Sequence, residues 1–193
     1  MASGRNTGSA AYPAALELER KHGDPRPCVH LLRGGRTFLN GKSLGMLRTK
    51  PDAPRLVWDK VPFVPGKLEA VGYDEERREI ARACRVTTGD PAAIGCRIEQ
   101  ESCACGGKYV FAELFLTDTQ GNEIDTAGEE LEIEISGGTL IGLDNGDARC
   151  LMPFKRRTVK LYNGRAMATA RMDEGGTITV RCAGLASPCR IKV

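Results

Sequence analysis

The alternation of apolar and polar residues predicts β-strands along most of the chain. From residue 25 onward, short apolar runs are cut by Gly, Pro, Asn and Asp every 8 to 12 residues or so, roughly the spacing of all-β domains. The pattern is clearest at 130–135, where leucine and isoleucine alternate with glutamate. We expect the aliphatic residues of this segment to face a core and its glutamates to face water.

The first half of the chain is predicted to hold short strands joined by tight turns. These strands cover 28–32, 36–39, 43–47, 55–61, 68–73 and 79–86. Asn40-Gly41 predicts a type I′ hairpin turn, because both central residues of that turn need positive φ. The sequence TTGDP at 87–91 predicts a joint between two modules, since Gly and Pro end regular structure.

The second half repeats the pattern with a more apolar central strand. Its predicted strands cover 93–100, 109–118, 130–135, 139–143, 158–162, 165–172, 177–183 and 188–193. The 109–118 segment is apolar on both faces, so we expect it to be central and covered on both sides. A long helical period and a βα alternation are both absent from the sequence, which argues against a parallel sheet.

Together these patterns predict an all-β chain of two tandem immunoglobulin-like β-sandwich modules. We expect a poorly structured N-terminal tail at 1–24, an immunoglobulin-like β module with an incomplete first strand at 25–89, and a C-terminal immunoglobulin-like sandwich at 90–193. A length of 193 residues suits two domains of ordinary size.

Composition narrows the classes of partner. The net charge is +3, the Lys and Arg residues are scattered, and only 5% of residues are aromatic, so we expect no nucleic-acid partner. No run reaches the roughly 20 apolar residues that span a bilayer, and residues 1–24 lack the apolar core of a signal peptide. The sequence therefore predicts no membrane association, and a cytoplasmic location if the chain is complete as given.

The eight cysteines have no repeated spacing, which favours free thiols over a disulfide framework and leaves both open. They are Cys28, Cys84, Cys96, Cys103, Cys105, Cys150, Cys182 and Cys189. A structural zinc site usually takes paired CxxC units or histidines, and His22 and His30 are the only histidines. We expect no cofactor, because the glycine-rich phosphate-binding patterns are also missing.

Few residues suggest a site. The carboxylates of 129–134 could serve a glycosidase, but a solvated strand face explains them, and no GxSxG elbow marks a nucleophile. Asp144 and Asp147 flank an Asn-Gly pair that could hold Ca²⁺ or form a turn stabilised by its own carboxylates. Trp58 and Tyr73 could stack on a sugar ring or pack in a core.

An ordered series of motifs resembles one enzyme family. The first group is FLNGKSLG at 38–45, Trp58, VPFVPGKLEAVGY at 61–73 and TTG at 87–89. The second is FLTDTQGN at 115–122, GLDNGD at 142–147, LYNGRA at 161–166 and GGTITV at 175–180. These resemble, in order, the immunoglobulin-like module after the catalytic barrel and the terminal sandwich of bacterial β-galactosidase-type enzymes of glycoside hydrolase family 2.

The resemblance implies a non-catalytic C-terminal accessory region of a retaining enzyme that removes terminal sugars. The partners it implies are the catalytic barrel and the neighbouring sandwich domains of such an enzyme. In the family the two catalytic glutamates lie on the barrel, and no residue here matches them, so we expect the isolated chain not to be an enzyme. The alternatives are a free-standing carbohydrate-binding module and, from fold analogy alone, an adhesion module.

Overall fold

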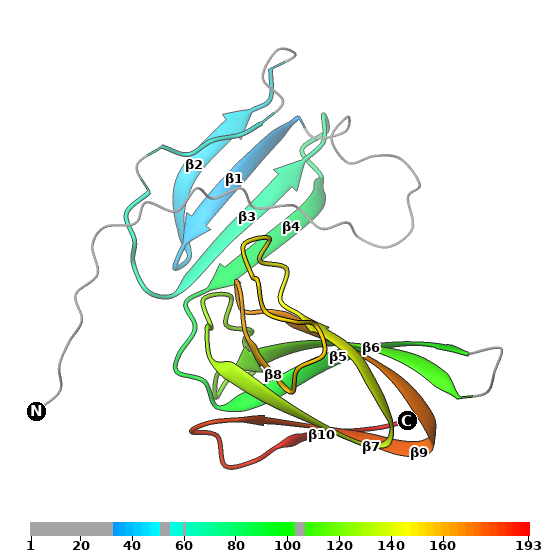
Figure 1. Cartoon of the computed structure of the whole chain (residues 1–193). Helices are drawn as coiled ribbons and strands as arrows, with labels where there is room; N and C mark the ends of the chain where they lie inside the picture. The colour runs from blue at the N-terminus through cyan, green and yellow to red at the C-terminus, as the bar shows by residue number, and fades with distance from the viewer. Residues whose placement is uncertain (1–32, 51–54, 60, 103–106) are drawn as a thin grey trace, which may run out of the picture. The chain divides into compact units, whose positions relative to one another are not determined.

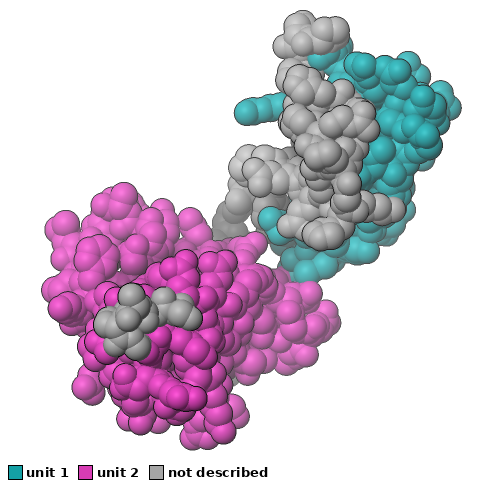
Figure 2. All heavy atoms as spheres, turned by 90° about the vertical axis from the view of Figure 1, so that its right-hand side faces the viewer, with its two compact units in different colours: residues 1–87 teal, residues 88–193 magenta. Residues whose placement is uncertain are grey.

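The computed structural model describes residues 33–50, 55–59, 61–102 and 107–193. In these ranges the regular secondary structure consists of β-strands. The described residues contain no helix that could cross a membrane. Two compact units, 1–87 and 88–193, are coloured separately in Figure 2. The boundary adjoins the predicted joint at 87–91. The predicted tail at 1–24 and the strand predicted at 28–32 lie outside the described residues.

The first unit holds one antiparallel sheet of order β2-β1-β3-β4 (Figure 1). Its strands are β1 (Gly34–Leu39), β2 (Lys42–Arg48), β3 (Lys67–Tyr73) and β4 (Glu79–Val86). Asn40 and Gly41 join β1 to β2 with φ of 50° and 79°, which confirms the predicted hairpin turn.

The strand predicted at 55–61 is wrong, because residues 55–59 and 61 lie outside any strand. Leu56 and Trp58 instead lie over the sheet at Gly35. A Cβ placed on Gly35 would be 2.7 Å from Leu56 Cδ1 and 3.4 Å from Trp58 Cη2. The apolar residues of this segment therefore cover a face of the sheet from a loop. The loop shows the alternation of apolar and polar residues that a strand has, but the backbone of its described residues is not hydrogen-bonded into the sheet.

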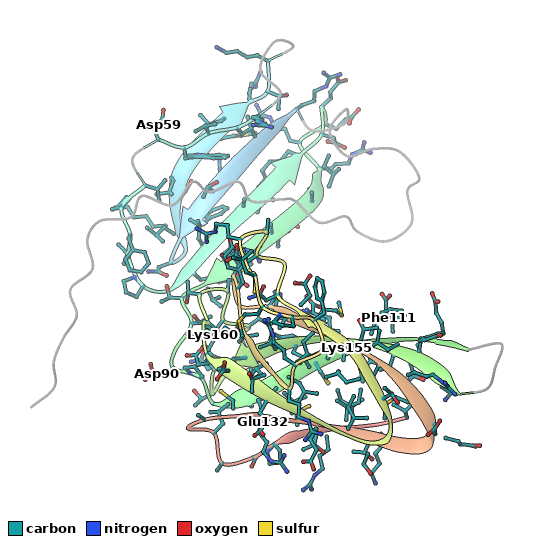
Figure 3. The ribbon with its side chains drawn as sticks, in the orientation of Figure 1. Asp59, Asp90, Phe111, Glu132, Lys155 and Lys160 are labelled. Atoms are coloured by element: carbon teal, nitrogen blue, oxygen red, sulfur yellow. The ribbon has the colours of Figure 1, made fainter. Side chains whose placement is uncertain are left out.

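The second unit holds six antiparallel strands in the order β5-β6-β9-β7-β8, with β10 also paired to β9. They are β5 (Ala93–Ser102), β6 (Lys108–Thr117), β7 (Glu130–Asp144), β8 (Thr158–Lys160), β9 (Ala166–Cys182) and β10 (Cys189–Lys192). On β7, Leu131 and Ile133 are buried and the three glutamates are exposed, as the alternation predicted. Glu132 is labelled in Figure 3.

Two of these strands are longer than the sequence predicted. The breaks expected near 136–138 and 173–176 are irregularities inside β7 and β9, where the pairing moves from Ser136↔Thr177 to Gly138↔Met172. Four residues of β9 therefore oppose one of β7, and both strands bend there (Figure 1). A Cβ on Gly176 would lie 2.4 Å from the Gly137 carbonyl oxygen, so the backbones approach too closely for a side chain.

The bend folds the sheet into two layers around one core. The first half of β9 pairs with β6, the second half pairs with β10, and β10 comes into contact with β5 across the module. The core side chains come from β6, β8 and β10, from both halves of β7 and β9, and from the connecting residues Ile124, Ala127 and Leu161. The all-β prediction is confirmed, and the two antiparallel sheets are consistent with β-sandwich domains.

Candidate functional site

The two candidate sugar-stacking residues lie on opposite faces of the first sheet. Trp58 is half-buried over Gly35, and its indole N–H donates to the Gly45 carbonyl oxygen at 3.3 Å. Tyr73 is half-buried and pairs with Gly34, the neighbour of Gly35, so its side chain points to the other face. The structure does not bring them together, and a role for either in sugar binding stays a prediction.

Asp144 and Asp147 use their carboxylates within a turn. Asp144 Oδ1 accepts the backbone N–H groups of Asn145 and Gly146 at 2.8 and 3.3 Å, and Asp147 Oδ1 accepts that of Arg149 at 3.0 Å. The Arg149 side chain and backbone N–H both lower the pKa of Asp147. No group of three or more metal-ligating side chains occurs in the described ranges. This geometry is that of an Asx-stabilised turn.

The loop that follows this turn exposes large apolar side chains. Leu151, Met152 and Phe154, which we call the 151–154 patch, are 96%, 61% and 64% exposed. The loop also carries Lys155, labelled in Figure 3. Exposed apolar groups this close together are a common mark of an interaction surface.

The backbone of this loop is tied to β7 at the last residue of the patch and three residues after it. The Leu143 N–H donates to the Phe154 carbonyl oxygen at 2.8 Å, and the Ile133 N–H donates to the Arg157 carbonyl oxygen at 2.7 Å. Both donors lie on β7. The apolar side chains are therefore presented by an ordered backbone rather than by a loop that must fold on binding.

A hollow of about 260 Å³ lies beside the patch, lined by Met152, Phe154, Cys150 and Arg156 among others. Both terminal nitrogens of Arg156 lie 3.8 Å from the Cys150 sulfur. The Met152 backbone N–H and the Arg156 guanidinium lower the pKa of Cys150. The lining also includes the carboxylates of Asp144 and Asp147, so the hollow combines an apolar wall with charged groups of both signs.

A second cluster covers the outer face of β6. Phe115 is only 7% exposed because Arg97 and Arg165 lie over its ring, with the guanidinium carbons 4.6 and 5.1 Å from the ring centre. Each arginine forms ion pairs with both Glu113 and Glu123. The prediction that β6 is covered on both sides holds at Phe115, but the cover is a set of charged side chains. Because these carboxylates are engaged by guanidinium groups, the cluster is structural.

Asp118 organises the turn after β6. Its carboxylate accepts the Asn122 side-chain N–H at 3.1 Å and the backbone N–H groups of Gly89, Gln120 and Asn122 at 2.9 to 3.1 Å. The Asn122 side chain and then these backbone donors lower the pKa of Asp118 to about 2. Asp118 therefore ties the beginning of the second unit, at Gly89, to this turn.

We expect Asp118→Asn to lower the melting temperature at pH 7. The folded pKa of about 2 lies below the ordinary value of 3.8, so the stabilisation is present above about pH 4 and is lost as the pH falls toward 2. The difference in melting temperature between wild type and variant should therefore shrink over that range, as followed by circular dichroism. Asp90→Asn, at an exposed position labelled in Figure 3, is the control; a difference independent of pH would contradict this role.

Family models match both units. Residues 98–187 match "Glycoside hydrolase family 2 C-terminal domain 5", and residues 33–81 match a domain of unknown function, DUF4982. A search of curated proteins found no match. The first match covers most of the second unit and the second covers the sheet of the first, so each unit has a counterpart among known domains.

Solved structures show the same arrangement of strands. Two crystal structures of a glycosyl hydrolase family 2 member from Bacteroides cellulosilyticus match 84% of this chain at 24% and 25% identity, with TM-scores of 0.76 and 0.74. A β-glycosidase from Bacteroides vulgatus matches 84% of it at 27% identity and TM-score 0.73. The matched regions are 23%, 21% and 21% of those proteins, so the chain spans about a fifth of their length.

The fold and these matches first give the class of protein. The chain is all-β, its two antiparallel sheets are consistent with β-sandwich domains, and its fold resembles part of a solved β-glycosidase. More particularly, residues 98–187 match a C-terminal domain of glycoside hydrolase family 2, which confirms the resemblance of the motifs to this family. The 151–154 patch, the Phe115 cluster and the Asp118 turn were not predicted from the sequence. The patch left a signal there as three large apolar residues between a turn and the basic run at 155–157, and Phe115 and Asp118 lie in the motif FLTDTQGN at 115–122.

Proposed function

We propose that this chain is a non-catalytic accessory region that braces the catalytic barrel and neighbouring sandwich domains of a family 2 glycosidase. The observation that carries the proposal is the 151–154 patch, whose apolar side chains stand in solvent on a loop with an ordered backbone. Burying them against another domain would remove this apolar surface from water, which is favourable in proportion to the area covered.

The surroundings of the patch indicate the kind of surface that would cover it. Lys155 and Arg157 are exposed directly after the patch, and Arg149 is exposed just before it. Interfaces of this kind are apolar at the centre and polar at the rim. We therefore expect the bracing partner to offer an apolar face edged by carboxylates.

The resemblance also supports a proposal for the substrate class of the whole enzyme. We infer that the enzyme removes terminal sugars from β-glycosides, with β-galactosides as the first class to test, because the motif series resembles β-galactosidase-type enzymes. A relative at 27% identity is a β-glycosidase, which supports the broader class. The alternative of a free-standing sugar-binding module is not favoured by the placement of Trp58 and Tyr73 on opposite faces.

If the chain braces the barrel, making the 151–154 patch polar should reduce the stabilisation of the catalytic barrel by the chain. The chain is mixed with a family 2 catalytic barrel from the same genome, and residual activity on p-nitrophenyl β-galactoside and β-glucuronide is followed after heating. We expect the wild-type chain to raise the inactivation temperature of the barrel by several degrees. The triple variant Leu151→Ser, Met152→Ser, Phe154→Ser should lose most of that effect, since it removes the apolar surface.

A matched control changes three exposed residues on the strand face of β7, namely Glu130→Ser, Glu132→Ser and Glu134→Ser. This control should brace the barrel as the wild type does. Equal loss in both triple variants, or no effect of the wild-type chain on the barrel, would contradict the proposal. Hydrolysis of either substrate by the chain alone would contradict its non-catalytic role.

A further inference from the structure

Two thiols meet where the two layers of the second unit close on each other. The sulfur atoms of Cys96 on β5 and Cys189 on β10 are 3.7 Å apart, and both side chains are half-buried against the core. β5 pairs with β6 and β10 pairs with β9, so the two strands share no backbone ladder. Among the described residues no backbone hydrogen bond joins β5 to β10, so the two strands meet there through their side chains.

We propose that Cys96 and Cys189 are a disulfide site that fastens β5 to β10. The sulfur atoms must approach by about 1.7 Å to reach the length of an S–S bond, a change within reach of side-chain rotation. Burial raises the pKa of Cys189 to about 11, so this thiol stays protonated at neutral pH and reacts slowly as a nucleophile.

The oxidant that fits is a low-molecular-weight disulfide such as oxidised glutathione. The thiolate of one cysteine attacks one sulfur of the glutathione disulfide, which forms a mixed disulfide with that cysteine and displaces the other glutathione as a thiolate that takes up a proton. The second cysteine then attacks the protein sulfur of that mixed disulfide, forms the S–S bond and releases the second glutathione. The two cysteines lose two electrons and two protons, and the glutathione disulfide gains them.

The long sequence separation of the two cysteines would make the disulfide strongly stabilising. Cys96 and Cys189 are 93 residues apart, so the bond would close a loop that contains most of the second unit. Cross-linking a loop this long restricts the unfolded chain strongly. The other described cysteines differ in place: Cys84 is exposed on the first unit, Cys150 lies beside Arg156, and Cys182 is buried in the core.

The test compares one protein in two redox states. The full chain is incubated with oxidised glutathione or with dithiothreitol, and peptide mass spectrometry and thermal unfolding are recorded. We expect a cross-linked peptide pair containing Cys96 and Cys189, lighter by two hydrogen atoms, and a melting temperature for the second unit higher by roughly 10 °C than in the reduced protein. Cys84→Ser should behave as the wild type, whereas Cys96→Ser should lose both the link and the increase.

Four results would overturn the proposal. They are both thiols still free after incubation with oxidised glutathione, glutathione left attached to Cys96 or Cys189 without a link, either cysteine linked to a different one, and the expected link without a higher melting temperature. Because the main comparison uses the wild-type chain, it stands even if a serine variant fails to fold.

Discussion

Replacing Leu114 with alanine is expected to lower the free energy of unfolding of the second unit by about 3 to 5 kcal/mol. Leu114 on β6 is completely buried, paired with Cys96 on one side and Ala166 on the other. Ala112 and Ala168, its buried neighbours on β6 and β9, are too small to fill the space that its side chain would leave. The measurement is urea unfolding followed by circular dichroism.

Ile98→Ala is the matched control for this variant. Ile98 lies on β5 next to β6, but its side chain is 39% exposed, so its truncation should cost much less. Equal losses for the two variants would mean that the second unit does not depend on the core formed by β6, β7 and β9. A large loss of unfolding free energy for Leu114→Ala alone would show that the second unit depends on that core for its stability.

Gly164→Ala is expected to destabilise the second unit by about 2 to 4 kcal/mol. Gly164 has φ of 73° in the turn before β9, a conformation that costs alanine energy. A Cβ at this position would also lie 2.3 Å from the Ile124 carbonyl oxygen and 2.8 Å from Asp125 Cα. These are backbone atoms, so the clash can be relieved only by moving the turn away from its neighbour.

Gly146→Ala separates the cost of a positive φ from the cost of the clash between the new Cβ and backbone atoms. Gly146 has the same φ of 73°, but nothing lies within 4 Å of a Cβ placed there. It should therefore show the conformational cost alone, about 1 kcal/mol. Thermal unfolding of both variants gives the comparison, and a Gly164→Ala that is no less stable than Gly146→Ala would show that the turn yields freely.

The 151–154 patch and the Cys96–Cys189 pair, the two features for which we propose a role, have different physical origins. The 151–154 patch is a set of apolar side chains that the second unit does not bury, and its role depends on another domain. The Cys96–Cys189 pair depends only on the closure of the module itself. The redox experiment can therefore succeed or fail independently of the bracing experiment.

The sequence alone determined the fold class, most of the strands and one turn. Alternation at 130–135 set which side of β7 faces the core, because a strand turns successive side chains to opposite faces. Asn40-Gly41 specified its hairpin because few residue pairs adopt two positive φ angles. The motif series was enough to indicate glycoside hydrolase family 2.

Only the tertiary structure decided how these pieces meet. The alternation at 55–61 could not show that Leu56 and Trp58 cover a sheet from a loop, because packing on a face and pairing in a ladder leave the same pattern. The glycines near 137 and 175 suggested strand ends, but bent strands also need them. The contact between Cys96 and Cys189 joins positions 93 residues apart, and local sequence carries no record of such a distant neighbour.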